Sequence, residues 1–275
     1  MVEEGKELSL REIQMVEYQL LCKLVELLEK HNLRYFLTGG TLLGAIRHNG
    51  FIPWDDDIDV LVPRDDYEKL RELVKRHETG GLDLKIPEDN GYFFPFIKAI
   101  DKRYVVRDYD FHEHLEQYIW VDIFPLDHFP DDTKEHRKWV KKLENARVVL
   151  QFAKCNHKAA TTRRRKIAFV GTKTVAFMYG GIHNLSMYID KLAIKMNRKF
   201  ITSNHAGNGT WPSNTRDYFE MDELFPTTEH IFEDRMFRIP GKYDSFLTKF
   251  YGDYMTLPPE DKRIDHHLKA YRREV

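Results

Sequence analysis

The stretch "GFIPWDDDIDVLVP", residues 50–63, places four carboxylates directly before and within an apolar run that has the composition of a buried strand. Like charges repel and an ionised carboxylate is costly to bury, so a fold keeps such a cluster only where cations or solvent neutralise it. Alternate residues of a strand share a face. Asp57 and Asp59 are therefore predicted to point to one side of a strand over residues 57–63, and the apolar side chains to the other.

The spacing of this acid pair suits a divalent cation. Two positions along a strand separate the side chains by ~6.6 Å, and two carboxylates at that distance can hold one or two cations between them. Asp122, within the apolar run "YIWVDIFP", is the best candidate for a third ligand, and an acid buried there is expected to have a cationic partner. Oxygen ligands favour Mg²⁺ or Mn²⁺. The alternative is a solvated acidic loop or a helix cap.

The two remaining acids of the cluster are ambiguous. Asp55 shares the metal side only if the strand begins that early, whereas Asp56 points away and ends the cluster.

The segment "TGGTLLG", residues 38–44, has the composition of a phosphate-binding turn. Gly39 and Gly40 let backbone N–H groups approach an anion closely, and the start of the following helix adds its positive dipole end. Thr41 is expected to cap that helix or to bind a phosphate oxygen. The alternative is an ordinary glycine turn. The order of strand, glycine pair, helix and Asp-x-Asp strand is more specific than either motif alone.

Length and composition exclude several classes of protein. The chain has 275 residues, of which 42% are hydrophobic, which is enough for a substantial core and argues against a disordered protein. The longest nearly apolar stretch, residues 167–182, is short for a membrane span and contains Lys173, so we expect a cytoplasmic protein. Cys22 and Cys155 form no metal-like or redox-like pair.

Periodicity predicts an α/β (α+β) fold followed by a mainly helical region. A capping box at Ser9 and Glu12 starts the first helix, and strands are favoured between residues 82 and 125. After Pro130 the pattern is helical to about residue 200, and a polar glycine-containing loop is expected over 202–214. The expected units are a catalytic core at 1–132, a basic helical region at 133–205 and a carboxy-terminal segment at 206–275 that packs back on the core.

Charge is concentrated in the middle of the chain. Residues 156–200 contain ten Lys or Arg and a single acid, Asp190, so this segment carries +9 and the rest of the chain about −10, given −1 overall. Such a module indicates a polyanionic partner, either nucleic acid, anionic lipid or a phosphate-rich polymer. The arginine run beside an apolar stretch at 161–177 is typical of segments that lie on anionic bilayers. A solvated helical face with one packed side is the alternative.

Three motifs carry a resemblance to a known family. "FLTGGTLLGAIRHNGFIPWDDDIDVLVPRDDYEKL" resembles the signature of the LicD family, a branch of the nucleotidyltransferase superfold that includes bacterial phosphocholine transferases and animal fukutin-like proteins. "VDIFPLD" and "YGDYMTLPPEDKR" also match that family. The resemblance covers most of the chain and is weakest at about 135–205.

The resemblance implies transfer of phosphocholine, or of a related phospho-alcohol, from a CDP-linked donor to a sugar hydroxyl. It implies that Asp57 and Asp59 hold the metal ions and that Asp122 is the third acid. It also implies contacts to the donor phosphates from a glycine turn and a nearby arginine, namely Gly39, Gly40, Thr41 and Arg47.

Further basic residues are candidates for donor binding. Lys98, in the strand-like "FIKAIDK", fits a phosphate contact, and a place on the solvent face of an edge strand is the alternative. Lys262, Arg263 and His266 follow "LPPED" and could close over the donor; the alternative is a basic start of a carboxy-terminal helix. The pair His112 and His114, on one face of an expected strand, is a weak candidate for zinc. Aromatic residues are numerous enough to hold choline, but the sequence does not indicate which.

The leading hypothesis is a metal-dependent transfer of phosphocholine from CDP-choline to a glycan or lipid-linked glycan acceptor, of the teichoic acid or lipopolysaccharide type. We expect a peripheral contact with anionic membrane and no nucleic acid. Transfer of ribitol phosphate, a nucleotidyltransferase that uses a nucleoside triphosphate, and a membrane-associated scaffold with a degenerate site are the alternatives. Release of CMP or of pyrophosphate would distinguish the enzyme hypotheses, and intact Asp57, Asp59 and Asp122 argue against the scaffold.

Overall fold

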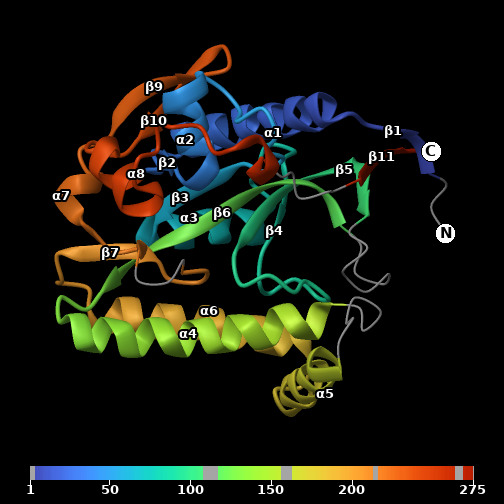
Figure 1. Ribbon diagram of the computed structural model, residues 1–275, viewed down its shortest axis with the longest axis vertical. Coiled ribbons are helices and arrows are strands. Elements are labelled where there is room, and N and C mark those ends of the chain that lie inside the picture. The colour runs from blue at the N-terminus through green and yellow to red at the C-terminus, as the bar shows by residue number, and fades with distance from the viewer. Residues whose placement is uncertain (1–3, 108–116, 156–162, 213–215, 264–268, 275) are drawn as a thin grey trace.

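The computed structural model describes residues 4–107, 117–155, 163–212, 216–263 and 269–274 (Figure 1). Within these ranges nine strands form one mixed sheet, and helices lie on both sides of it (Figure 1). The predicted α/β class is confirmed.

The helices are α1 (Leu10–Lys30), α2 (Gly39–His48), α3 (Arg64–Lys75), α4 (Thr133–Lys154), α5 (Arg163–Met178), α6 (Ile182–Lys199), α7 (Met221–Leu224), α8 (Tyr243–Tyr251) and the 3₁₀ helix η3 (Glu260–Lys262). The strands of the large sheet are β1 (Glu4–Glu7), β2 (Phe36–Leu37), β3 (Asp59–Pro63), β4 (Asp83–Lys85), β5 (Ile97–Arg107), β6 (Gln117–Phe129), β7 (His205–Asn208), β8 (Phe219–Glu220) and β11 (Lys269–Arg273). A separate hairpin joins β9 (Thr228–Phe232) and β10 (Arg235–Ile239).

The sheet is organised around its two longest strands, β5 and β6. Its main path runs β1, β11, β5, β6, β3, β2, with β4 beside β5, and β7 and then β8 beside the far end of β6. The β3–β6 pair is parallel, whereas β5–β6 is antiparallel. The carboxy-terminal residues contact the sheet twice, through β7 on β6 and β11 on β5.

The first helix forms as its sequence predicts. Ser9 accepts a hydrogen bond from the Glu12 backbone, and the Glu12 carboxylate accepts one from the Ser9 N–H at 2.7 Å, which completes the predicted capping box. Its apolar side is buried against β5 and β6. Burial of this face is the main source of stability for an amphipathic helix.

The glycine-containing loop predicted for 202–214 is wrong at its centre, where β7 pairs with the end of β6. Glycine and asparagine favour turns in a local reading, but here the missing side chain is a packing requirement. A Cβ at Gly207 would lie 2.2 Å from the Asp217 carbonyl oxygen and 2.6 Å from the Phe129 ring. Only a glycine lets the strand pass between these neighbours.

The long helices beside the sheet have an apolar cluster of their own. Residues of α4, α5 and α6 pack together with Phe129 at the end of β6 (Figure 1). No helix in the described ranges is both long enough and apolar enough to cross a bilayer.

A buried ionic network attaches this helical layer to the core. Arg64 of α3 grips Asp127 of β6 through two hydrogen bonds of 2.6 Å, and Arg71 of α3 contacts Asp190 of α6 at 3.0 Å. Arg64 is also within 3.6 Å of Asp190. Asp190 is 1% exposed, so the single acid of the basic segment is the one that anchors α6 to the core.

Replacement of Asp190 by Asn is therefore expected to lower the free energy of unfolding by ~3 kcal/mol, because two buried guanidinium groups lose a charged partner. Urea denaturation would measure the change. The exposed pair of Asp222 with Lys242, at 2.7 Å, provides the control, since Asp222→Asn should cost less than ~1 kcal/mol. Equal effects of the two substitutions would contradict the anchoring role.

Candidate active site

Four neighbouring strands bring charged residues into one row across the sheet. Asp59 of β3 is paired with Asp122 of β6, Asp122 with Lys98 of β5, and Lys98 with Lys85 of β4. Residues paired directly across neighbouring strands share a face. The row therefore runs from two acids to two lysines, with strand spacings of ~4.8 Å.

Lys98 and Asp122 form the centre of this row. The Lys98 Nζ lies 2.9 Å from Asp122 Oδ1, and the lysine side chain is 6% exposed. The prediction that Asp122 has a cationic partner is confirmed, and the alternative of Lys98 on a solvent-facing edge is wrong, because both neighbours of β5 are strands. Burial lowers the pKa of Lys98, and it raises the pKa of Asp122 although Lys98 acts in the opposite direction.

The acid segment departs from its prediction in one respect. The strand starts at Asp59 and not at Asp57, because pairing with β6 begins at the Ile58 carbonyl, which accepts from the Asp122 N–H at 2.8 Å. Burial nevertheless alternates through the preceding residues, and Asp55, Asp57 and Asp59 line one cavity of about 500 Å³. Asp56 is 2% exposed and does not line that cavity, as the alternation predicted.

The glycine pair lies where the acids meet the start of α2. A Cβ on Gly40 would lie 2.5 Å from Asp55 Oδ2, and one on Gly39 would lie 2.7 Å from Asp59 Oδ2. Gly39 also has φ +56°, in the left-handed region that favours glycine. The pair therefore lets two carboxylates approach the positive end of a helix dipole.

Thr41 does not line the cavity but contacts Asp59, which does. Its Oγ1 accepts a hydrogen bond from the Asp59 N–H at 2.8 Å and so holds the start of β3 against α2. The residue at the helix N-cap is Thr38, and its side chain makes no capping hydrogen bond. The expected capping role of Thr41 is wrong for this reason.

Two carboxylates at or near the cavity have raised pKa values. Burial and the charges of Asp57 and Asp122 raise the pKa of Asp59 well above its usual range. Burial and the charges of Asp57 and Asp56 do the same to the pKa of Glu17, a residue of α1 that is 2% exposed. Among the described residues, no group of three or more His, Cys, Asp or Glu side chains has the arrangement of a metal site.

Comparison with known proteins decides the family. A family model described as "LicD/FKTN/FKRP, nucleotidyltransferase domain" matches residues 32–154. The "Lipopolysaccharide cholinephosphotransferase LicD" of Haemophilus influenzae is 31% identical over 268 residues, which make up 96% of this chain and 98% of that protein. The chain belongs to the LicD family.

Two other relatives match over shorter stretches. The "Ribitol 5-phosphate transferase FKRP" of Mus musculus is 32% identical over 96 residues, 35% of this chain and 18% of that protein. The "Uncharacterized protein RP689" of Rickettsia prowazekii is 32% identical over 114 residues, 42% of this chain and 40% of that protein. The LicD resemblance drawn from the motifs is thus confirmed.

The basic residues predicted to bind the donor are not all at the cavity. Arg47 donates to the Tyr254 carbonyl at 3.0 Å and does not line the cavity with the acids. Arg263 donates to the Pro258 carbonyl and its guanidinium lies 5.2 Å from the Trp54 ring centroid. Lys262 is exposed on η3. Their roles toward a donor stay predictions.

Three predicted residues fall outside the described part of the chain. They are His266, expected near the donor, and His112 and His114, the weak zinc candidates.

Three residues that line the cavity of this LicD protein were not predicted as site residues. Arg216, Phe250 and Tyr251 lie beside the acids, and Arg216 Nη1 donates to the Phe250 carbonyl at 3.2 Å. Phe250 and Tyr251 form the end of α8, where Tyr251 is the first residue of the family motif "YGDYMTLPPEDKR" and Phe250 directly precedes it. That motif was the one available signal for the two rings.

Replacement of Gly39 by Ala is expected to lower the free energy of unfolding by about 1–2 kcal/mol, because a left-handed backbone strains any residue with a Cβ. The new Cβ would also displace the Asp59 carboxylate. Gly171 within α5, where a Cβ would meet nothing within 4 Å, is the control, and Gly171→Ala should raise stability by ~0.5–1 kcal/mol. Urea denaturation measures both. A Gly39→Ala protein as stable as the wild type would contradict the described start of α2.

Proposed function

We propose that the protein transfers phosphocholine from CDP-choline to a sugar hydroxyl of a cell-surface glycan precursor, of the teichoic acid or lipopolysaccharide type, in a metal-dependent reaction. The row of Asp59, Asp122 and Lys98 beside the start of α2 carries this proposal. Full-length similarity to a protein named as a lipopolysaccharide cholinephosphotransferase supports the choice of head group.

The cavity between α2, β3 and α8 has the chemistry of the donor. Its carboxylates suit divalent cations, and Arg216 together with the N–H groups at the start of α2 suits the diphosphate. A trimethylammonium group binds well to aromatic faces that lie near negative charge. Phe250 and Tyr251 offer such faces in the same cavity as Asp55 and Asp57.

Asp57 and Asp59 would hold Mg²⁺ or Mn²⁺, with Asp122 as the third predicted ligand. A bound cation would stabilise the charge that develops on the diphosphate and on the departing CMP. The chain itself positions these acids through Thr41 and the glycine pair.

Asp122 is the candidate to accept the proton of the acceptor hydroxyl. The acceptor oxygen forms a bond to the phosphorus of phosphocholine while the bond from that phosphorus to the CMP oxygen breaks, and the hydroxyl proton passes to the carboxylate. Burial raises the pKa of Asp122, and the carboxylate would take this proton only where the cation leaves one of its oxygens free. Lys98, at 2.9 Å, keeps the carboxylate oriented in its ionised form.

Two other classes of donor would give different experimental results. Similarity to a ribitol 5-phosphate transferase over 35% of the chain favours a CDP-linked polyol as the second candidate, with the same acids in the same roles. A nucleoside triphosphate would require release of pyrophosphate in place of CMP.

The donor hypothesis predicts that CDP-choline binds more tightly than CTP or CDP-ribitol in Mg²⁺, and that EDTA abolishes this binding. Asp59→Asn should lower the rate of CMP release by at least ~100-fold. It should also raise Tm in EDTA, because it removes a partly buried carboxylate whose pKa is already raised. Titration calorimetry, CMP release and thermal unfolding measure the three effects. Asp222→Asn is the exposed control. Tighter binding of CTP, or binding that ignores EDTA, would contradict the hypothesis.

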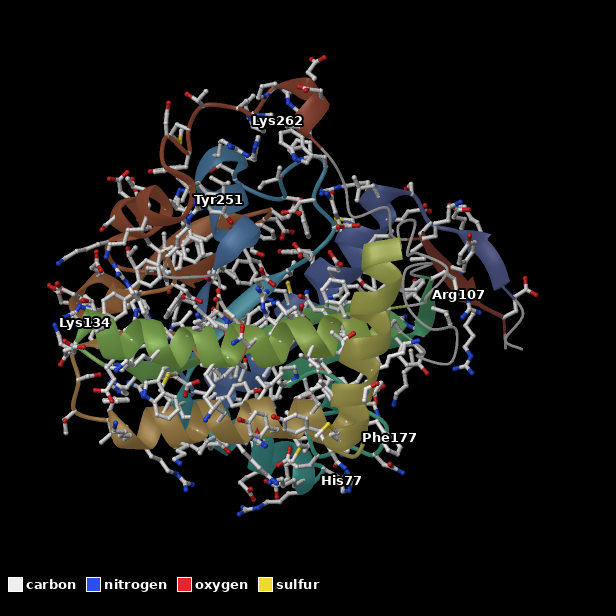
Figure 2. All side chains as sticks on the ribbon, turned by 60° about the horizontal axis from the view of Figure 1, so that its bottom comes forward. His77, Arg107, Lys134, Phe177, Tyr251 and Lys262 are labelled. Atoms are coloured by element: carbon white, nitrogen blue, oxygen red, sulfur yellow. The ribbon has the colours of Figure 1, made fainter. Side chains whose placement is uncertain are left out.

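We also propose that a cytoplasmic form of the protein rests on anionic membrane through α5. Phe177 and Met178 at the end of this helix are 81% and 79% exposed, which is unusual for large apolar side chains. Phe177 lies at the opposite edge of the molecule from Lys262 of η3 (Figure 2). The basic segment 156–200 supplies attraction to anionic lipid.

The membrane hypothesis predicts that the protein sediments with vesicles containing phosphatidylglycerol and not with neutral vesicles. The double substitution Phe177→Ser and Met178→Ser should reduce the bound fraction at least ~10-fold, because two apolar side chains no longer enter the interface. Met236→Ser, which removes an equally apolar side chain that is 56% exposed on β10, is the control. Unchanged binding of the α5 variant would contradict the assignment.

A further inference from the structure

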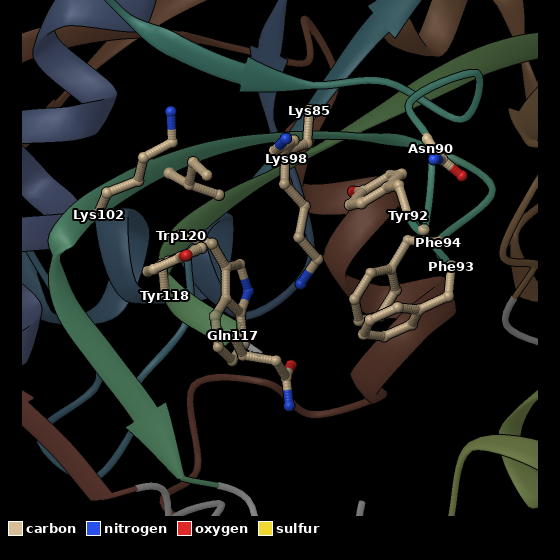
Figure 3. A pocket seen from close by; sticks show the side chains of 12 residues that line it. Lys85, Asn90, Tyr92, Phe93, Phe94, Lys98, Lys102, Gln117, Tyr118 and Trp120 are labelled. Atoms are coloured by element: carbon tan, nitrogen blue, oxygen red, sulfur yellow. The ribbon is translucent and has the colours of Figure 1, made fainter. Parts of the chain in front are cut away.

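A second cavity, of about 290 Å³, opens at the lysine end of the charged row (Figure 3). Its walls come from β4, β5, β6 and the loop at residues 90–94. Asp122 separates it from the donor cavity, because Lys98 lines the one and Asp59 lines the other, and both are paired with Asp122. The same row of paired residues therefore borders both cavities.

The two cavities have opposite charge. Among the described residues, the second cavity is lined by Lys85, Lys98 and Lys102 and by no acidic side chain. Lys85 and Lys102 have acidic partners outside the lining, Asp89 at 3.8 Å and Asp83 at 2.5 Å, but the lysine side chains are 39% and 47% exposed. Exposed ion pairs of this kind are weak, so both lysines remain able to bind an incoming anion.

Aromatic rings give this cavity flat walls. Tyr92, Phe94, Tyr118 and Trp120 line it, and the Lys98 Nζ lies between two of them, 4.1 Å from the Phe94 ring centroid and 3.9 Å from that of Trp120 (Figure 3). The position that a quaternary ammonium would take between these rings is therefore filled by an ammonium of the protein itself. Choline is excluded here by charge, whereas a sugar ring can stack on the remaining faces.

We propose that this cavity binds the acceptor, and that the acceptor is an anionic sugar, with a phosphate or carboxylate that Lys85 and Lys102 contact. The inference rests on the proposed transferase function and deepens it. In-line transfer requires acceptor and leaving group on opposite sides of the phosphorus, and cavities on the two sides of Asp122 along the row would meet that requirement. The acceptor hydroxyl then points at Asp122 and its negative group points away, toward β4.

The proposal predicts that binding of the acceptor can be weakened without a change in binding of the donor. The double substitution Lys85→Gln and Lys102→Gln removes two charges at the cavity but leaves Lys98, Asp122 and the donor cavity intact. Both side chains are partly exposed, so the fold should tolerate the change. The donor should bind to this variant as to the wild type.

Quenching of tryptophan fluorescence provides the test, because Trp120 lines the cavity. Glucose 6-phosphate and glucuronate are titrated against glucose and tetramethylammonium, with Trp120→Phe to identify the reporting ring. We expect both or one of the anionic sugars to quench Trp120, to bind at least ~10-fold more tightly than glucose, and to lose that advantage in the lysine double variant. Whichever anionic sugar binds identifies the group as phosphate or carboxylate.

Three results would overturn the proposal: equal affinity for glucose and the anionic sugars, quenching by tetramethylammonium, or absence of quenching by either anionic sugar. Calorimetry with CDP-choline on the same proteins keeps the two hypotheses apart. Loss of CDP-choline binding in the lysine variant would place the donor in this cavity and so overturn the acceptor assignment. A wild type that binds an anionic sugar but releases no CMP from CDP-choline would instead refute the proposed donor.

Discussion

The parallel pairing of β3 with β6 is the constraint on which the rest of the site depends. It sets Asp59 beside Asp122, and the antiparallel pairing of β6 with β5 then sets Asp122 beside Lys98. A shift of either strand by one residue would turn its charged side chain to the opposite face of the sheet. The apolar residues that follow the acids on the two strands, such as Val60 and Ile123, are fully buried and prevent that shift. Hydrophobic packing therefore determines the position of the charges in the row.

Local patterns in the sequence were sufficient to find the acids and the glycine pair. The alternation around Asp59 and the isolation of Asp122 among apolar residues are properties of neighbouring residues, and so they survive without knowledge of the fold. Arg216 comes from a segment far along the chain, and nothing in its surroundings marks it as a site residue. Tyr251 begins a family motif, but its place in the cavity is decided only when α8 packs beside α2. β7 was missed because its glycine serves packing and not a turn.

The glycine pair shows how one motif serves a purpose other than the expected one. Gly39 and Gly40 were interpreted as space for a phosphate, and the structure shows that they first make space for Asp59 and Asp55. The two uses are compatible, because a cation held by these acids would draw a phosphate toward the same N–H groups. Replacement of either glycine would then disturb the acids before it disturbs any substrate.

The charged row also explains why the two cavities differ in charge. Asp122 and Lys98 neutralise each other at the centre, so the ends of the row keep opposite character: carboxylates with Asp59, lysines with Lys85. The raised pKa values of Asp59 and Glu17 indicate that the acidic end costs free energy when no cation is present. A cation bound there would recover that free energy as binding affinity. The acidic end of the row, which is the less stable end without a ligand, would therefore gain the most free energy from binding one.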